Sequence, residues 1–250
     1  MIRTTASVAA VVLALAGCSE GGSGGKPRLT VSAAQSLKAP FEDYGTQFDA
    51  ATVRLSFAGS DELAAQIRQG VRPDVYAAAD TALPEQLYAE GLVERPVRFA
   101  GNRLVIAVPA GSDIQTIDDL TDEGTQLAVG ADTVPVGAYT RQVLDRLPAA
   151  RRRAILSNVR SNEPDVSGVV GKLAQGAADA GFLYATDLVP VSDSLRAIEL
   201  PRELAPEVAY GAAVVRGAER PETATAFIEG LLSGAGRRAL EEAGFEAPPG

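Results

Sequence analysis

The sequence predicts an α/β fold of two lobes, with mixed, mainly parallel sheets and a ligand cleft between the lobes. Short apolar runs alternate with segments of helical periodicity from residue 29 onward. The alternation restarts near residue 127, which indicates two sets of elements. Two extended segments, 102–109 and 201–211, are placed to join the sets. We therefore expect lobe I over 29–106 and 208–250, and lobe II over 107–207.

The first set of elements follows from apolar spacing and turn residues. Phe41, Tyr44 and Phe48 lie three and four residues apart, which places them on one face of a helix. Gly70 fits the left-handed position that often follows the last turn of a helix. The predicted elements are strands over 29–34, 53–58 and 74–79, a helix that ends near residue 50, and a helix over 61–69.

The second set repeats this alternation, and the end of the chain returns to the first lobe. Residues 102–108 predict one apolar strand. The Arg151-Arg152-Arg153 run is expected at a solvated helix end, and residues 246–250 are expected to fray. The other predicted elements are strands over 127–130, 180–184 and 208–215, and helices over 138–147, 166–175, 222–232 and 236–243.

The composition excludes several classes of function. Histidine is absent, so neither a Ser-His nor a Cys-His pair nor a histidine-ligated metal can form. The single cysteine excludes an intramolecular disulfide bond. The net charge of −9 argues against nucleic acid as a partner. We expect no enzyme and no resident cofactor, since catalysis here would need an Asp/Glu pair or one of Lys26, Lys38 and Lys172.

The N-terminal residues have the pattern of a targeting signal. A basic start precedes the apolar run 6–16, which is too short to span a bilayer as a helix and is typical of a signal peptide. Leu15-Ala16-Gly17-Cys18 resembles a bacterial lipobox, in which the cysteine carries the lipid. We expect a signal peptide over 1–17, and over 18–28 a lipidated Cys18 and a Gly/Ser-rich tether on an extracytoplasmic, membrane-anchored protein. An ordinary secretory signal is the alternative.

Several predicted strands end in hydrogen-bond donors. Ser36 and Ser60 follow the first two strands at positions that suit N-caps, and the turns 134–137 and 165–168 open two further helices. Helix N-termini present free N–H groups, and Tyr184 adds a hydroxyl at another strand end. A deprotonated oxyanion carries only acceptors, so donors alone make its complementary site. The alternative is that these residues only cap helices and form turns.

Four segments at these positions resemble one known family. They are 31–37, 56–64, 73–80 and 101–105, and their order and spacing resemble those of the molybdate-binding lipoproteins and periplasmic proteins of ABC transporters. The resemblance covers roughly residues 29–245. It implies a type II periplasmic-binding fold whose lobes close around molybdate, with tungstate nearly equivalent, and delivery to the subunits of a membrane permease.

The resemblance also implies a ligand set. Ser36 and Ser60 would donate from their hydroxyls, Val136 and Val166 from their backbone N–H groups, and Tyr184 from its phenol, with no residue bound directly to the metal. No partner beyond the anion, the permease and the membrane lipid at Cys18 is expected, and the chain is expected to be a monomer.

Three residues depart from the family pattern. They are Gln35 in the first turn, Asp61 directly after Ser60, and the bulky Val136. A carboxylate at position 61 would repel a dianion if it faced the site. Sulfate, phosphate or a small organic acid therefore stays an alternative ligand, and an enzyme or a surface scaffold on the same fold is a further alternative.

Overall fold

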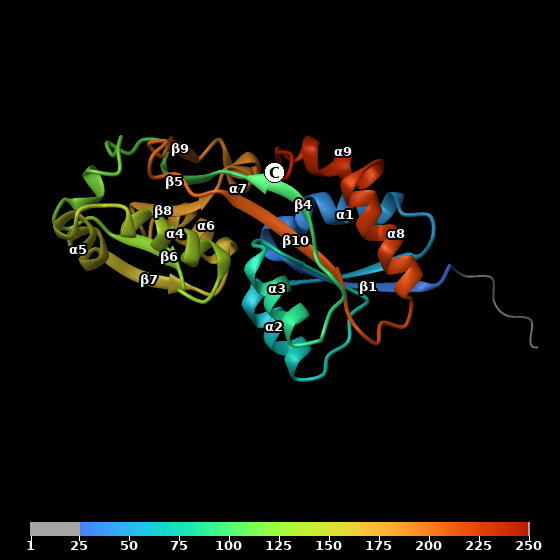
Figure 1. Cartoon of the computed structure of the whole chain (residues 1–250). Helices are drawn as coiled ribbons and strands as arrows, with labels where there is room; N and C mark the ends of the chain where they lie inside the picture. Colours follow the sequence, from blue (N-terminus) through green and yellow to red (C-terminus); the bar gives the residue numbers. More distant parts are fainter. Residues whose placement is uncertain (1–25, 250) are drawn as a thin grey trace, which may run out of the picture.

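The computed structural model of this chain describes residues 26–249 (Figure 1). The predicted signal peptide over 1–17, Cys18 and most of the predicted tether lie outside the described residues. No helix within the described range is both long and apolar enough to cross a membrane.

The first lobe is built on a mixed sheet of order β2-β1-β3-β10-β4. Its strands are β1 (Arg28–Ala34), β2 (Thr52–Ala58), β3 (Val75–Ala78), β4 (Val97–Asn102) and β10 (Val208–Val214). β1 pairs in parallel with β2 and β3, whereas β10 is antiparallel to β3 and β4. Its helices are α1 (Lys38–Gln47), α2 (Ser60–Arg68), α3 (Ala82–Ala89), α8 (Pro221–Leu232) and α9 (Ala235–Glu242). The parallel strands bring the carboxyl ends of β1, β2 and β3 to one edge.

The second lobe is built on a sheet of order β7-β6-β8-β5-β9. Its strands are β5 (Leu104–Pro109), β6 (Leu127–Gly130), β7 (Val159–Glu163), β8 (Ala180–Tyr184) and β9 (Leu195–Glu199). β6 is parallel to β7 and β8, and β5 is antiparallel to β8 and β9. Its helices are α4 (Pro135–Asp145), α5 (Ala149–Ser157), α6 (Val166–Ala174) and α7 (Ala185–Leu188). Both sheets are mixed, as predicted, but they are not mainly parallel, because each combines two parallel with two antiparallel pairings.

The chain crosses between the sheets at Arg103, where the prediction of one strand over 102–108 is wrong. Asn102 ends β4 in the first sheet, and Leu104 begins β5 in the second. The Asn102 side chain turns back to accept a hydrogen bond from Arg103 N (2.8 Å), which interrupts the strand. All of β5 therefore lies in the second sheet, whereas the predicted boundary left its first three residues in lobe I. Figure 1 shows β10 beside β4 on the return path.

Several further expectations need correction. The strands β7 and β9 and the helices α3 and α5 were not predicted. The sequences of β7, β9 and α5 are polar and half-exposed, which gives weak periodicity, and α3 is only eight residues long. The Arg151-Arg152-Arg153 run lies inside α5, not at its end. Glu246 does not fray, because its backbone pairs with Gly101 through bonds of 2.9 and 3.0 Å.

The predicted helical face of α1 is confirmed by its packing. Phe41, Tyr44 and the following Phe48 all stack against Phe227 of α8, with ring centroids 5.8, 4.6 and 5.3 Å apart. Phe41 and Phe227 are fully buried, and each such side chain contributes about 1.5–3 kcal/mol through burial. Gly70 has the predicted left-handed φ of 103°. This cluster fixes α1, and with it the turn that follows β1.

Candidate functional site

A small cavity lies between the two lobes at the carboxyl ends of their strands. Its volume is about 20 Å³, whereas a single water needs on the order of 10–15 Å³, so it holds one compact ligand. All five predicted ligand residues line it, from both lobes. The lining residues are Ala34, Gln35, Ser36, Ala58, Gly59, Ser60, Ala79, Val134, Pro135, Val136, Asp165, Val166 and Tyr184.

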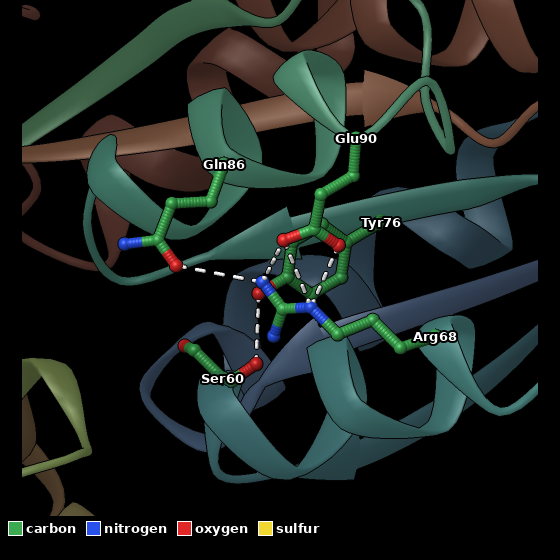
Figure 2. A network of polar contacts seen from close by, with 5 residues as sticks. All are labelled: Ser60, Arg68, Tyr76, Gln86 and Glu90. Atoms are coloured by element: carbon green, nitrogen blue, oxygen red, sulfur yellow. Dashed lines mark hydrogen bonds and ion pairs between the residues drawn. The ribbon is translucent and has the colours of Figure 1, made fainter.

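Ser60 is held by its own lobe. It is the first residue of α2, so it is not the predicted N-cap, which is Gly59. Its Oγ accepts a hydrogen bond from Ala79 N (3.1 Å), at the end of β3. Its carbonyl accepts one from the Tyr76 hydroxyl (2.7 Å), as Figure 2 shows. Because Oγ is the acceptor in its bond with Ala79 N, the hydroxyl proton of this buried serine is free to point into the cavity.

The helix that carries Ser60 is also tied to its neighbour. Arg68 near the end of α2 bonds to Glu90 at the end of α3 (2.8 Å) and to Gln86 (3.4 Å), and Figure 2 shows these contacts beside Ser60. Because this ion pair is partly exposed, it contributes only about 0–1 kcal/mol. The contribution of these contacts is therefore mainly to hold α2 against α3.

Ser36 is positioned by a side chain of β10. It lies in the short 3-10 turn η1 (Gln35–Leu37) between β1 and α1, and the N-cap of α1 is Leu37 and not the predicted Ser36. Its Oγ accepts a hydrogen bond from the Tyr210 hydroxyl (3.1 Å) of β10. The Ser36 hydroxyl is thus an acceptor toward Tyr210, and its proton is available to a ligand.

The second lobe presents the N-terminus of α4, which begins three residues earlier than predicted. Val134 is the N-cap and Pro135, which has no N–H, is the first residue. Val136 is second, a position whose N–H has no partner within its helix. Gly137 is required here, because a Cβ would lie 1.9 Å from Ala131 O. The missing side chain lets α4 start directly against the end of β6.

The N-terminus of α6 adds a second set of donors and one carboxylate. Asp165 is the N-cap, and its Oδ1 accepts bonds from Gly168 N (3.1 Å) and the Ser167 hydroxyl (2.6 Å). Val166 follows as the first residue, so its N–H is also without a partner in the helix. Asp61, the carboxylate singled out from the sequence, does not line the cavity, whereas Asp165 does.

Tyr184 reaches the cavity from the end of β8. Among the described residues, its hydroxyl is the buried side-chain polar atom left without a hydrogen-bond partner. Such a group costs about 1–3 kcal/mol when unpaired. Burial raises the pKa of Tyr184 well above its ordinary value, so the phenol keeps its proton. The hydroxyl is therefore a neutral donor that a ligand in the cavity would satisfy.

The two lobes touch at the rim of this cavity. A Cβ on Gly59 would lie 2.6 Å from Pro164 O, which belongs to the second lobe, and 3.7 Å from Val134 Cγ1. Only a glycine allows the turn after β2 to approach the opposite backbone so closely. The cavity is thus assembled by contact between the lobes.

The electrostatics of the cavity are those of neutral dipoles. No Lys or Arg is among its lining residues, and Asp165 is the charged member. Neutral donors avoid the desolvation cost that a buried countercharge carries. Within residues 26–249, no group of three or more Cys, Asp or Glu side chains is arranged to hold a metal ion.

Sequence reasoning missed the residues that position the two serines. Tyr210 and Asn102 were treated only as parts of extended segments, and Tyr76 as part of a buried strand. A tyrosine in a buried strand needs a hydrogen-bond partner for its hydroxyl. The tyrosines in these strands were therefore the sequence signal for such contacts.

Comparison with known proteins agrees with this geometry. Residues 29–246 match the family model of the bacterial extracellular solute-binding proteins. The chain belongs to this family. It is 35% identical to the molybdate-binding protein ModA of Mycobacterium tuberculosis H37Rv, over 90% of this chain and 86% of that protein. It is 31% identical to ModA of Escherichia coli K12, over 76% and 78% respectively.

The fold comparison confirms the predicted architecture. The periplasmic molybdate-binding protein of Azotobacter vinelandii aligns with a TM-score of 0.78 at 20% identity, covering 88% of this chain and all of that chain. The type II periplasmic-binding fold and the resemblance to molybdate-binding proteins are therefore confirmed. Membership of an extracellular family indicates an extracytoplasmic protein. The relatives are solute-binding proteins, which supports a role other than catalysis.

Proposed function

We propose that this protein captures molybdate, and also tungstate, between its lobes and delivers it to the permease of an ABC importer. The observation that carries the proposal is the cavity in which two serine hydroxyls, two helix N-termini and the unpaired Tyr184 hydroxyl converge. The names of the ModA relatives support the choice of anion. The ligands are Ser36, Ser60 and Tyr184 through their hydroxyls, and Val136 and Val166 through their N–H groups.

Selectivity follows from donors and size. Sulfate carries no proton but is smaller than molybdate, so the same donors lie too far from its oxygens. Hydrogen phosphate needs an acceptor for its proton, and an unmet proton costs about 1–3 kcal/mol. The presence of Asp165 in the lining makes hydrogen phosphate the second candidate ligand, because a carboxylate could accept that proton.

The test is calorimetric titration of the chain with molybdate, tungstate, sulfate and phosphate, followed by Ser36→Ala and Ser60→Ala. We expect binding of molybdate and tungstate only, and a loss of about 1.5–3 kcal/mol in each variant, as for a charge-assisted hydrogen bond. Tight binding of phosphate alone would replace molybdate by the second candidate. Unchanged molybdate affinity in both variants would refute the ligand assignment.

We further propose that the protein acts as a monomer anchored through lipid on Cys18. The lipobox-like Leu15-Ala16-Gly17-Cys18 and the extracellular family support the lipid anchor. Mass spectrometry of the membrane fraction should find the mature N-terminus at Cys18 with a diacylglyceryl group. Cys18→Ser should release the protein from membranes, and an unmodified protein cleaved elsewhere would contradict the proposal.

A further inference from the structure

A line of polar groups leads from the crossing between the lobes to Ser36. Asn102 is 6% exposed and Tyr210 is fully buried, and neither lines the anion cavity. Asn102 Nδ2 lies 3.4 Å from the Tyr210 hydroxyl oxygen, and that hydroxyl lies 3.1 Å from Ser36 Oγ. Asn102 Nδ2 also lies 2.9 Å from Thr186 Oγ1, in α7 of the second lobe.

The direction of these hydrogen bonds is fixed by one backbone group. Arg103 N lies 2.8 Å from Asn102 Oδ1, and a backbone N–H can only donate, so this atom of the amide must be the oxygen. The amide nitrogen then faces Tyr210 and Thr186 and donates to both. With its oxygen accepting from Asn102, the Tyr210 hydroxyl directs its own proton to Ser36 Oγ.

We propose that Tyr210, oriented by Asn102, is a specificity-determining positioning residue that makes Ser36 a donor toward the anion. The inference rests on the proposed function of this cavity as an oxyanion site. Successive bonds that point the same way polarise one another, which strengthens the last donor. Because Tyr210 takes one of the two lone pairs of Ser36 Oγ and the Ser36 proton points to the anion, this oxygen has little capacity left to accept the proton of a ligand such as hydrogen phosphate.

The aromatic ring of Tyr210 has a separate, structural role. It packs edge-on against Phe99, Phe245 and Tyr184, with centroids 6.2, 5.3 and 5.7 Å away. Tyr210→Phe keeps these contacts and removes only the hydroxyl. The matched control is Tyr139→Phe, since the buried Tyr139 hydroxyl contacts the backbone of Ala209 (3.4 and 3.5 Å) and not a ligand residue.

The experiment is a double-mutant cycle on the full chain purified in mild detergent, read by calorimetric titration with molybdate. Tyr210→Phe is measured with Ser36 present and in the Ser36→Ala background. We expect about a five- to tenfold loss of affinity with Ser36 present and less than about twofold in Ser36→Ala. Asn102→Ala, measured in the same two backgrounds, should repeat this pattern, and Tyr139→Phe should change affinity less than about twofold in both.

A second readout separates positioning from loss of fold. In Tyr210→Phe, competition experiments should show the ratio of phosphate to molybdate dissociation constants falling about tenfold, because Ser36 regains an acceptor. The sulfate-to-molybdate ratio should stay within about twofold, since both anions carry no proton.

The possible outcomes separate the two proposals. Equal losses in both backgrounds, or equal weakening of every anion, would overturn this inference and leave the proposed function standing. If Ser36→Ala itself bound molybdate as tightly as the unchanged chain, the ligand assignment in the proposed function would fail first.

Discussion

The two serine turns of the first lobe perform one task with different supports. Ser60 Oγ accepts from the backbone N–H of Ala79, within the same lobe. Ser36 Oγ accepts from the side chain of Tyr210, which is linked through Asn102 to Thr186 of the second lobe. A backbone donor is present whatever the side chain, whereas a side-chain donor is removed by one substitution. The backbone therefore positions the Ser60 hydroxyl whatever the neighbouring side chains are, whereas the position of the Ser36 hydroxyl depends on which residue stands at position 210.

The largest expected effect on anion affinity tests the Ser60 turn as part of the contact between lobes. In Gly59→Ala, the added methyl group would lie 2.6 Å from Pro164 O, so the lobes could not meet as they do. Overpacking of this kind costs about 1–3 kcal/mol, and we expect the upper end as lost molybdate affinity measured by titration. Gly171→Ala, where a Cβ would meet only Gln175 Nε2 at 3.9 Å, is the control. Equal binding by the two variants would show that the lobes need not approach this closely.

A smaller effect separates the serines by stability. Ser60→Ala leaves the Ala79 N–H without its partner in a buried site, which costs about 1–3 kcal/mol in the unfolding free energy of the ligand-free protein. Ser36→Ala leaves the Tyr210 hydroxyl still bonded to Asn102, so we expect less than about half of that loss. Denaturant unfolding of both variants without anion measures the difference. A larger loss for Ser36→Ala would reverse the comparison.

The Ser36 side of the site also contains a titratable group. Asp187 accepts a bond from Tyr184 N (3.2 Å), and burial raises its pKa to about 7, with the Tyr184 N–H lowering it and the Asp165 charge raising it. Because the folded pKa lies above the unfolded value near 4, folding favours the protonated form. The stability that this group contributes is complete below pH 4 and is lost as the pH rises to 7.

The expected slope is about 1.4 kcal/mol per pH unit between these values. Unfolding of the unchanged chain and of Asp187→Asn, compared from pH 4 to pH 8, isolates it, because other groups titrate equally in both proteins. Parallel stability curves would show that Asp187 is ionised in the folded protein.

Much of the architecture and the identity of the cavity residues followed from the sequence. The apolar runs gave the buried strands, and motif order placed Ser36, Ser60, Val136, Val166 and Tyr184, all of which line one cavity. Whether these residues bind the anion stays a prediction. The crossing between sheets at Arg103 could not be predicted, because nothing in an apolar run marks where its partner strands change.

The supports of the serines were equally hidden, since they depend on contacts between distant segments. Tyr210 meets Ser36 across 174 positions of the chain, and Tyr76 meets Ser60 across 16. Local periodicity indicates strands and burial but not hydrogen-bond partners, so it placed both tyrosines in extended segments and nothing more. Whether Asp61 faced the site was left open from the sequence, and in the structure Asp165, not Asp61, lines the cavity.

The smallest expected effect sharpens the comparison most directly. Tyr76→Phe removes the 2.7 Å bond to the Ser60 carbonyl but leaves the Ala79 N–H on Ser60 Oγ. We expect a loss of about 0.5–1.5 kcal/mol in the unfolding free energy, with molybdate affinity changed less than about twofold. Tyr210→Phe should do the opposite, with more effect on affinity than on stability. If both tyrosine variants lowered affinity equally, the Ser60 turn would depend on its side-chain support as much as the Ser36 turn does, and the distinction between a serine fixed by backbone and one set by residue choice would fail.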